Sequence, residues 1–477
     1  MRRWVLAAGA TAVIVMPTVL AFFSGGFFDE ARIIAGLVAW CLAIVAGIVT
    51  ARPLPVSSAG RIALLAITLL CAWVGLSLTW APLGGPAQDD LQRVLLYLGY
   101  FIASLAFLRV AGVKRALEPA LVLGAFVVVS YALSERLLPG VFELERSSSA
   151  AGRLEQPFTY WNAAGIAAAV GFVLAARVTG DPSRPGSLRA LTAAASVPLG
   201  LGVYLSFARG VLAALAVAML VLLALTPDGR AQLRSAVTLV CTAGVAALVA
   251  SGLTTVKSLG NSDSGEGLLM LGVLLALALG AAFLAPRTPR RSLELPALPG
   301  PRPAVVAVGA IVVAVAAALV VAAYEGKPDA ASPATGADPG RLSSIESNRY
   351  RYWEVALDVF TEHPLSGVGS GGFAVEWLKR PDRPDAARDA HSLYLETVAE
   401  LGLVGLTLLL LFFGAIAVAG SRLYRLDPRA AAGPVAALAA WGLHTGLDWD
   451  WEMPAVTLTA LLLAATLVAW GEEAPEV

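Results

Sequence analysis

One short segment combines a titratable side chain with a predicted entry into the membrane. His391 and Ser392 are followed by Leu393 to Gly402 and by Gly405, within AHSLYLETVAELGLVG. This histidine is one of three in 477 residues, and an imidazole with an ordinary pKa near 6.5 suits proton transfer at neutral pH. Because the segment turns apolar within one helical turn, we expect that His391 can do chemistry at a membrane surface.

Three further polar residues occur where the surrounding sequence is apolar. Arg209 lies in LSFARG, between two predicted helices, where it could bind an anion or extend to the lipid headgroups. Asn162 follows QPFTYW and could belong either to a site or to an interfacial turn. His444 is expected to pack inside the helix bundle.

The segment GLDWDWEMP carries three carboxylates between two tryptophans. Trp449 and Trp451 fit an interfacial aromatic belt. The carboxylates of Asp448, Asp450 and Glu452 are expected to be solvated there, although Asp448 is also a candidate substrate contact.

A polar segment upstream of His391 shows a second helical pattern. Ser343 and Glu346 have the spacing of a capping box. Arg349 lies four residues from both Ile345 and Trp353, so all three share one face of the predicted helix. Arg349 is therefore expected to face the membrane or the bundle and not open water.

Two features near this helix have alternative interpretations. The stretch EHPLSGVGSGGF (362–373) is expected to form a turn, or alternatively to offer backbone N–H groups to a phosphate. Glu396 and Glu400 share a helical stripe with Ser392, away from His391, so they are expected to need partners from other helices. A role in helix packing and a role in catalysis both remain open for these carboxylates.

The composition indicates a membrane protein. Hydrophobic residues make up 58% of the chain and charged residues 14%, which is too little polar surface for a soluble chain of this length. The formal net charge is zero, and no basic run suggests nucleic acid as a partner. Cys41, Cys71 and Cys241 lack the paired spacing of a disulfide framework or a zinc site, so no metal is expected.

About 20 apolar residues are needed for one helical crossing of a bilayer, and the sequence contains about fourteen such stretches. They are 4–23, 31–50, 61–80, 91–109, 116–134, 161–178, 187–206, 209–226, 233–251, 267–285, 304–324, 394–420, 433–447 and 454–470. The expected fold is all-α, a polytopic transmembrane bundle of about 12–14 helices with one large, partly helical extracytoplasmic loop.

This pattern divides the chain into four parts. Residues 1–324 would carry about eleven helices, 325–393 the loop with the site, 394–470 about three helices, and 471–477 a short cytoplasmic tail. Most Lys and Arg residues of the short loops fall on one side, which predicts that both termini are cytoplasmic and that the long loop is outside.

Three motifs together carry a resemblance to a known family. The pattern His391-Ser392, nine residues, Gly402, two residues, Gly405 resembles the signature of the O-antigen ligase and polymerase superfamily. Arg349 and Trp353, followed by ALDVFTEHPLSGVGSGGF, resemble its outer-loop pattern. SFARG is similar to its Ser-Arg-Gly element, with two residues inserted after the serine.

The resemblance implies transfer of a saccharide from an undecaprenyl-diphosphate-linked donor to a hydroxyl of a glycan, lipid or protein acceptor, without a cofactor or metal. In that scheme His391 is the general base, and Arg349 and Arg209 neutralise the diphosphate. Further candidate substrate contacts are Ser392, Arg351, Trp353, Asn162, Glu400, Gly402, Gly405 and Asp448.

Three functions fit these features. The first is a polymerase of surface polysaccharide repeat units, with a chain-length regulator as a further partner. The second is a ligase that transfers a finished glycan to a lipid or protein. The third is a transporter of lipid-linked glycans, which the position of the polar residues near one face disfavours. All three place the chain in the plasma (inner) membrane of a bacterium, and polymerisation is the preferred interpretation.

Overall fold

The computed structural model describes residues 2–260, 262–285, 336–338, 342, 347–380 and 386–473. Within these residues the fold is all-α, without β-strands, and eleven helices are long and apolar enough to span a membrane. These eleven are α1 (Arg2–Ala21), α2 (Asp29–Val49), α3 (Ser58–Ser77), α4 (Gly84–Phe107), α5 (Val113–Leu137), α6 (Trp161–Gly180), α7 (Gly186–Leu205), α9 (Gly229–Ser251), α11 (Ser264–Leu284), α15 (Leu393–Leu426) and α17 (Pro454–Gly471).

Shorter helices complete the described fold. They are η1 (Ser24–Gly26), α8 (Arg209–Leu225), α10 (Thr254–Ser258), α13 (Arg349–Glu362), α14 (Phe373–Leu378), α16 (Pro428–His444) and η3 (Asp450–Glu452). Each predicted apolar segment coincides with a helix except 304–324, which lies outside the described residues, as do Ser343 and Glu346. The predicted all-α transmembrane bundle is confirmed.

Helix α4 begins at Gly84, earlier than the predicted residue 91. Its first turns are polar but remain helical because their charges are paired. Asp89 accepts a hydrogen bond from Arg32 of α2 at 2.9 Å, and Asp90 pairs with Arg93 at 2.5 Å. The prediction from apolar composition therefore placed the start of this helix too late, because it left out these polar turns.

The bundle has two central helices and a lipid-facing periphery. In α6 and α17, 94% of the membrane-span window is buried, compared with 28% in α2 and 22% in α11. Helix α6 is rich in Ala and Gly (WNAAGIAAAVGF). Small residues let helices approach closely in lipid, where the hydrophobic effect does not drive helices together.

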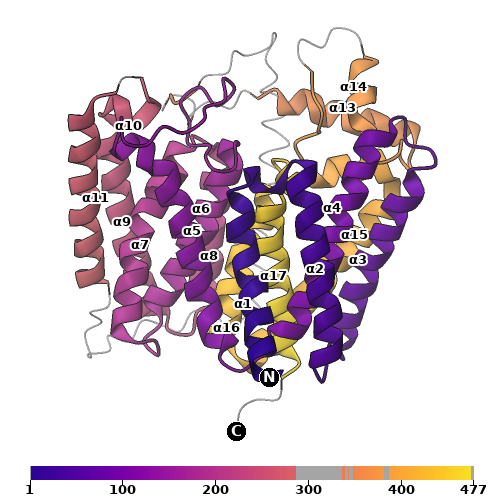
Figure 1. Ribbon diagram of the computed structural model, residues 1–477, viewed down its shortest axis with the longest axis horizontal. Coiled ribbons are helices and arrows are strands. Elements are labelled where there is room, and N and C mark those ends of the chain that lie inside the picture. Colours follow the sequence, from indigo (N-terminus) through magenta and orange to yellow (C-terminus); the bar gives the residue numbers. More distant parts are fainter. Residues whose placement is uncertain are drawn as a thin grey trace.

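The two ends of the bundle differ. Helix α1 begins and α17 ends at the lower end of Figure 1, whereas α13 and α14 lie at the upper end. A small apolar core, with Tyr352 and Val355 of α13 and Phe373 and Trp377 of α14, packs against Ala399 of α15. This core holds the polar segment of α13 and α14 against one end of the bundle.

Candidate active site

Asp448 lies at the centre of a buried polar cluster at the α13 end of the bundle. Its carboxylate, 0% exposed, accepts hydrogen bonds from Tyr160 Oη at 2.7 Å and from the Asn162 side-chain amide. Arg349 Nη2 lies 2.7 Å from Asp448 Oδ2, and the Trp449 N–H donates to Oδ1 at 3.0 Å. The cluster thus joins the start of α6, the start of α13 and the α16–α17 connection.

The surroundings of Asp448 favour a charged carboxylate. Burial acts to raise the pKa of Asp448, but the Arg349 guanidinium first, and then the hydrogen bond from the Tyr160 hydroxyl, lower it below its usual range. The expectation that the three carboxylates of GLDWDWEMP are solvated is wrong, because Asp448, Asp450 and Glu452 are 0%, 0% and 6% exposed. The tight turn between α16 and α17 folds them into the bundle.

Arg209 and Arg349 line one cavity next to this cluster. The cavity has a volume of about 50 Å³ and is lined by Asn162, Ala208, Arg209, Gly210, Ser347, Arg349 and His444. Arg209 is the first residue of α8 and Arg349 the first of α13, so two helix N-termini and two guanidinium groups meet there. Positive helix ends and arginines both favour an anionic ligand.

His391 precedes α15 in a left-handed backbone conformation, with φ of +53°. Its Nδ1 lies 3.0 Å from the Asp389 carbonyl oxygen, which can only accept, so Nδ1 carries the proton and Nε2 keeps a lone pair. The ring lies beside Tyr352, with 5.2 Å between centroids, and beside Trp449 at 6.1 Å. Burial lowers the pKa of His391 below its ordinary value, although the Asp448 carboxylate opposes this shift. The neutral imidazole is therefore suited to accept a proton.

The turn that carries His391 is held by the first residues of α15. Ser392 is the N-cap of this helix, and its hydroxyl accepts from Leu395 N. Glu396 accepts a hydrogen bond from the Ala390 N–H at 2.7 Å. Its partner therefore lies in the turn before its own helix, whereas the helical periodicity had predicted a partner on another helix. The chain folds back before the N-cap, which an ideal helix does not represent.

The Gly-rich stretch 362–373 binds a carboxylate of the protein itself. Glu400 accepts hydrogen bonds from Gly371 N and Phe373 N, both at 2.9 Å. The Gly369 N–H donates to the Glu400 carbonyl at 2.8 Å. These N–H groups are therefore used to hold the loop against α15, which supports the interpretation of this stretch as a turn.

Gly402 interrupts α15 where this loop crosses it. Its φ of +64° and ψ of −163° lie in a region that is almost restricted to glycine. A Cβ at this position would lie 2.2 Å from the Leu365 carbonyl oxygen. Leu403 N bonds Pro364 O at 2.9 Å, and the Leu401 carbonyl accepts from Trp73 Nε1 at 3.0 Å. The first glycine of the His-Gly-Gly pattern thus has a backbone role in the described structure.

Replacing Gly402 by alanine is expected to lower the free energy of unfolding by about 1–3 kcal/mol from backbone strain alone, with the clash against Leu365 added. Gly414→Ala is the matched control, because this glycine lies in the same helix with nothing within 4 Å of its added Cβ. The thermal midpoints of the two purified variants measure the difference. Equal midpoints would contradict the structural role of Gly402.

The remaining predicted contacts lie on α13 and on α15 with its N-cap. Arg351 follows Arg349 by two residues, which at about 100° per residue points its side chain to another face of α13. Trp353 lies beside Tyr350, with 5.5 Å between ring centroids. Gly405 is buried in α15 below the break. The predicted substrate contacts of these three residues, and of Ser392, Glu400 and Gly402, remain predictions.

Three residues of this region were not predicted as site residues from the sequence, namely Tyr160, His444 and Asp450. Tyr160 donates to Asp448, and His444 Nδ1 lies 2.6 Å from Asp450 Oδ2, with both of these side chains buried. His444 is packed in the bundle as predicted, but it also lines the cavity with Arg209. The available signal was the set of carboxylates inside an otherwise apolar segment, since such groups need buried partners.

The fold and the cluster define an α-helical polytopic membrane protein with a buried, arginine-containing polar site at one end of its bundle. Residues 264–410 match the family model described as O-antigen ligase. This stretch includes Arg349 and His391, and the match confirms the resemblance to the O-antigen ligase and polymerase superfamily. It supports an O-antigen ligase-type function in glycan transfer at a membrane. A search of the curated proteins finds no match.

Proposed function

We propose that the protein is a glycosyltransferase that moves a saccharide from an undecaprenyl-diphosphate-linked donor to an acceptor hydroxyl at the outer face of a bacterial plasma membrane. The observation that carries this proposal is the position of the His391 ring, whose Nδ1 bonds the Asp389 carbonyl oxygen and which lies beside Trp449, the residue after the Asp448 of the Asp448–Arg349 pair. The predicted orientation, with both termini in the cytoplasm, places this cluster outside.

The proposed reaction exchanges one bond at the anomeric carbon of the donor sugar. The acceptor oxygen forms a bond to that carbon while its proton passes to His391 Nε2. The bond from the carbon to the diphosphate oxygen breaks, and the diphosphate leaves with the electron pair. Neither a metal nor a nucleotide is needed in this scheme, because the lipid diphosphate supplies the driving force.

The arginines have separate tasks in this scheme. A guanidinium group has five N–H donors, so the ion pair with Asp448 leaves Arg349 able to bind a phosphate oxygen. Arg209, which also lines the cavity, would bind the second phosphate. Asp448 would position Arg349 and Asn162 and would not touch the reacting atoms, since its oxygens accept hydrogen bonds from protein donors.

Of the two glycan transfers, we propose polymerisation of surface polysaccharide repeat units, with a chain-length regulator as partner. The second candidate is ligation to a lipid or protein acceptor, which the description of the matched family favours. The deciding experiment compares the lipid-linked and surface glycans of the native host with wild-type protein, His391→Ala protein and no protein. Single repeat units retained on the carrier would support the polymerase, whereas long chains retained there would support the ligase and overturn polymerisation.

The transfer rate is expected to fall as the pH drops below about 6.5, the ordinary pKa of histidine. The base must be neutral, and burial lowers the pKa of His391, so the rate stays constant at neutral pH and declines only when the imidazole becomes protonated. Because the charge of Asp448 raises this pKa, Asp448→Asn should move the decline to lower pH. A pH profile with purified protein and lipid-linked donor measures both effects, and a decline centred above 7 would contradict them.

A further inference from the structure

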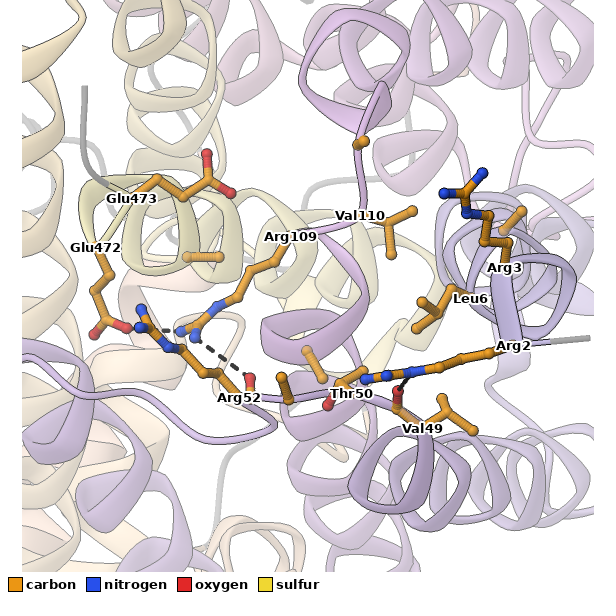
Figure 2. A pocket seen from close by; sticks show the side chains of 15 residues that line it. Arg2, Arg3, Leu6, Val49, Thr50, Arg52, Arg109, Val110, Glu472 and Glu473 are labelled. Atoms are coloured by element: carbon orange, nitrogen blue, oxygen red, sulfur yellow. Dashed lines mark hydrogen bonds and ion pairs between the residues drawn. The ribbon is translucent and has the colours of Figure 1, made fainter. Parts of the chain in front are cut away.

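A second cavity lies at the opposite end of the bundle, where α1 begins and α17 ends (Figure 2). Its volume is about 730 Å³. Four helices and the segments next to them form its walls. The lining residues that matter here are Arg2, Arg3 and Leu6 of α1, Val49 and Arg52 at the end of α2, Arg109 after α4, and Glu472 and Glu473 after α17.

Positive charge exceeds negative charge in this cavity. Four arginines line it, with two glutamates. Glu472 is only 3% exposed and is already bonded, because it pairs with Arg109 at 2.7 Å and accepts from Ser57 N at 2.8 Å. Within the described part of the chain, the guanidinium groups of Arg3 and Arg52 make no ion pair and no hydrogen bond. Two cationic side chains are therefore available to an anion.

Exposed apolar side chains flank the cavity. Trp4 is 80% exposed and Ile48 is 78% exposed, and each is adjacent in sequence to a residue that lines the cavity. A tryptophan at the end of a membrane helix is typical of the headgroup level. Leu6 lies further into α1 than Arg3, and Val49 lies further into α2 than Arg52, so the apolar walls of the cavity are on the bilayer side of its arginines. A cationic rim next to apolar walls at this depth matches an amphipathic, anionic ligand.

We propose that this cavity binds the headgroup of an anionic phospholipid between Arg3 on one side and Arg52 on the other (Figure 2), with its acyl chains along the exposed faces of α1 and α2. Basic pockets between membrane helices bind phospholipid headgroups by such contacts. The bound lipid contacts α1, α2, α4 and α17 together and stabilises their packing. This proposal does not depend on the function proposed for the other end of the bundle.

The test compares phosphatidylglycerol with zwitterionic phosphatidylethanolamine as stabilisers of the purified full chain in detergent. A ligand that binds only the folded state raises the thermal midpoint as its concentration rises. Phosphatidylglycerol is expected to raise the midpoint of wild-type protein more than phosphatidylethanolamine does. In Arg3→Gln/Arg52→Gln its apparent affinity should fall by about 30-fold, for two lost arginine contacts.

Arg422→Gln/Arg425→Gln is the matched control, because it removes two exposed arginines from α15 at the same end of the bundle. This control should respond to phosphatidylglycerol like wild type. Native mass spectrometry provides a readout that does not depend on whether the variants fold. The wild-type protein should retain the anionic lipid in this measurement. Equal responses of both double variants, equal effects of both lipids, or the same stabilisation by soluble glycerol 3-phosphate would overturn the proposal.

Discussion

Replacing His391 by alanine is expected to lower the rate of glycan transfer by about 10²- to 10⁴-fold, the usual contribution of a general base. The physical reason is that the variant has no lone pair to take the proton of the attacking hydroxyl group. In the wild-type protein the Nε2 of His391 carries this lone pair, because Nδ1 holds the ring proton and donates it to the Asp389 carbonyl oxygen. The rate is measured with purified protein, a lipid-linked donor and an acceptor, at equal amounts of folded protein.

Two further variants separate catalysis from structure at this position. His391→Asn suits the φ of +53°, because asparagine adopts left-handed conformations more readily than alanine. It should fold like wild type and still be inactive. His363→Ala, at the exposed C-cap of α13, is the control histidine and should retain activity. Wild-type rates in His391→Asn would remove the role of a base from this residue.

Asp448→Ala is expected to lower the free energy of unfolding by about 3 kcal/mol, at the lower end of the range for breaking a buried ion pair. The lower end applies because 24% of the Arg349 side chain is exposed, whereas Asp448 is fully buried. The substitution also leaves the donors of Tyr160 and Asn162 without their acceptor. Thermal midpoints and the yield of folded protein in the membrane fraction measure this loss.

The double variant Arg349→Met/Asp448→Leu distinguishes folding from function. Replacing both partners of a buried pair by apolar side chains of similar size is often neutral for stability, so this variant should recover the part of the lost thermal midpoint that comes from the unpaired Arg349, but not the part that comes from the donors of Tyr160 and Asn162. It should remain inactive in glycan transfer, since Arg349 is proposed to bind the diphosphate. Recovery of transfer together with folding would contradict that role.

The membrane helices could be predicted from the sequence because each is stabilised mainly within its own segment. In lipid, backbone N–H and C=O groups bond within the helix, so about 20 consecutive apolar residues are enough to indicate a span. The predicted segment 161–178 corresponds to α6 (Trp161–Gly180), for example, and 454–470 to α17 (Pro454–Gly471). The sequence also predicts Arg349 and His391 as site residues, because their motifs are contiguous in the chain, and this remains a prediction.

The partners within the cluster could not be predicted in this way. Asp448 meets Tyr160 and Arg349, which lie 288 and 99 residues away along the chain. Glu400 meets Gly371, because the loop crosses α15 at the break made by Gly402. Local periodicity contains no information on such crossings.

The sequence by itself determined the class of fold, most of the helices and the two residues at the centre of the proposed chemistry. The tertiary structure decided that the carboxylates of GLDWDWEMP are buried and that Arg209 and Arg349 share a cavity. It also showed that the glycine-rich loop binds a glutamate of the protein. The physical reason is that a helix depends on hydrogen bonds between near neighbours, whereas the charge state and partners of a side chain depend on which distant segments pack around it.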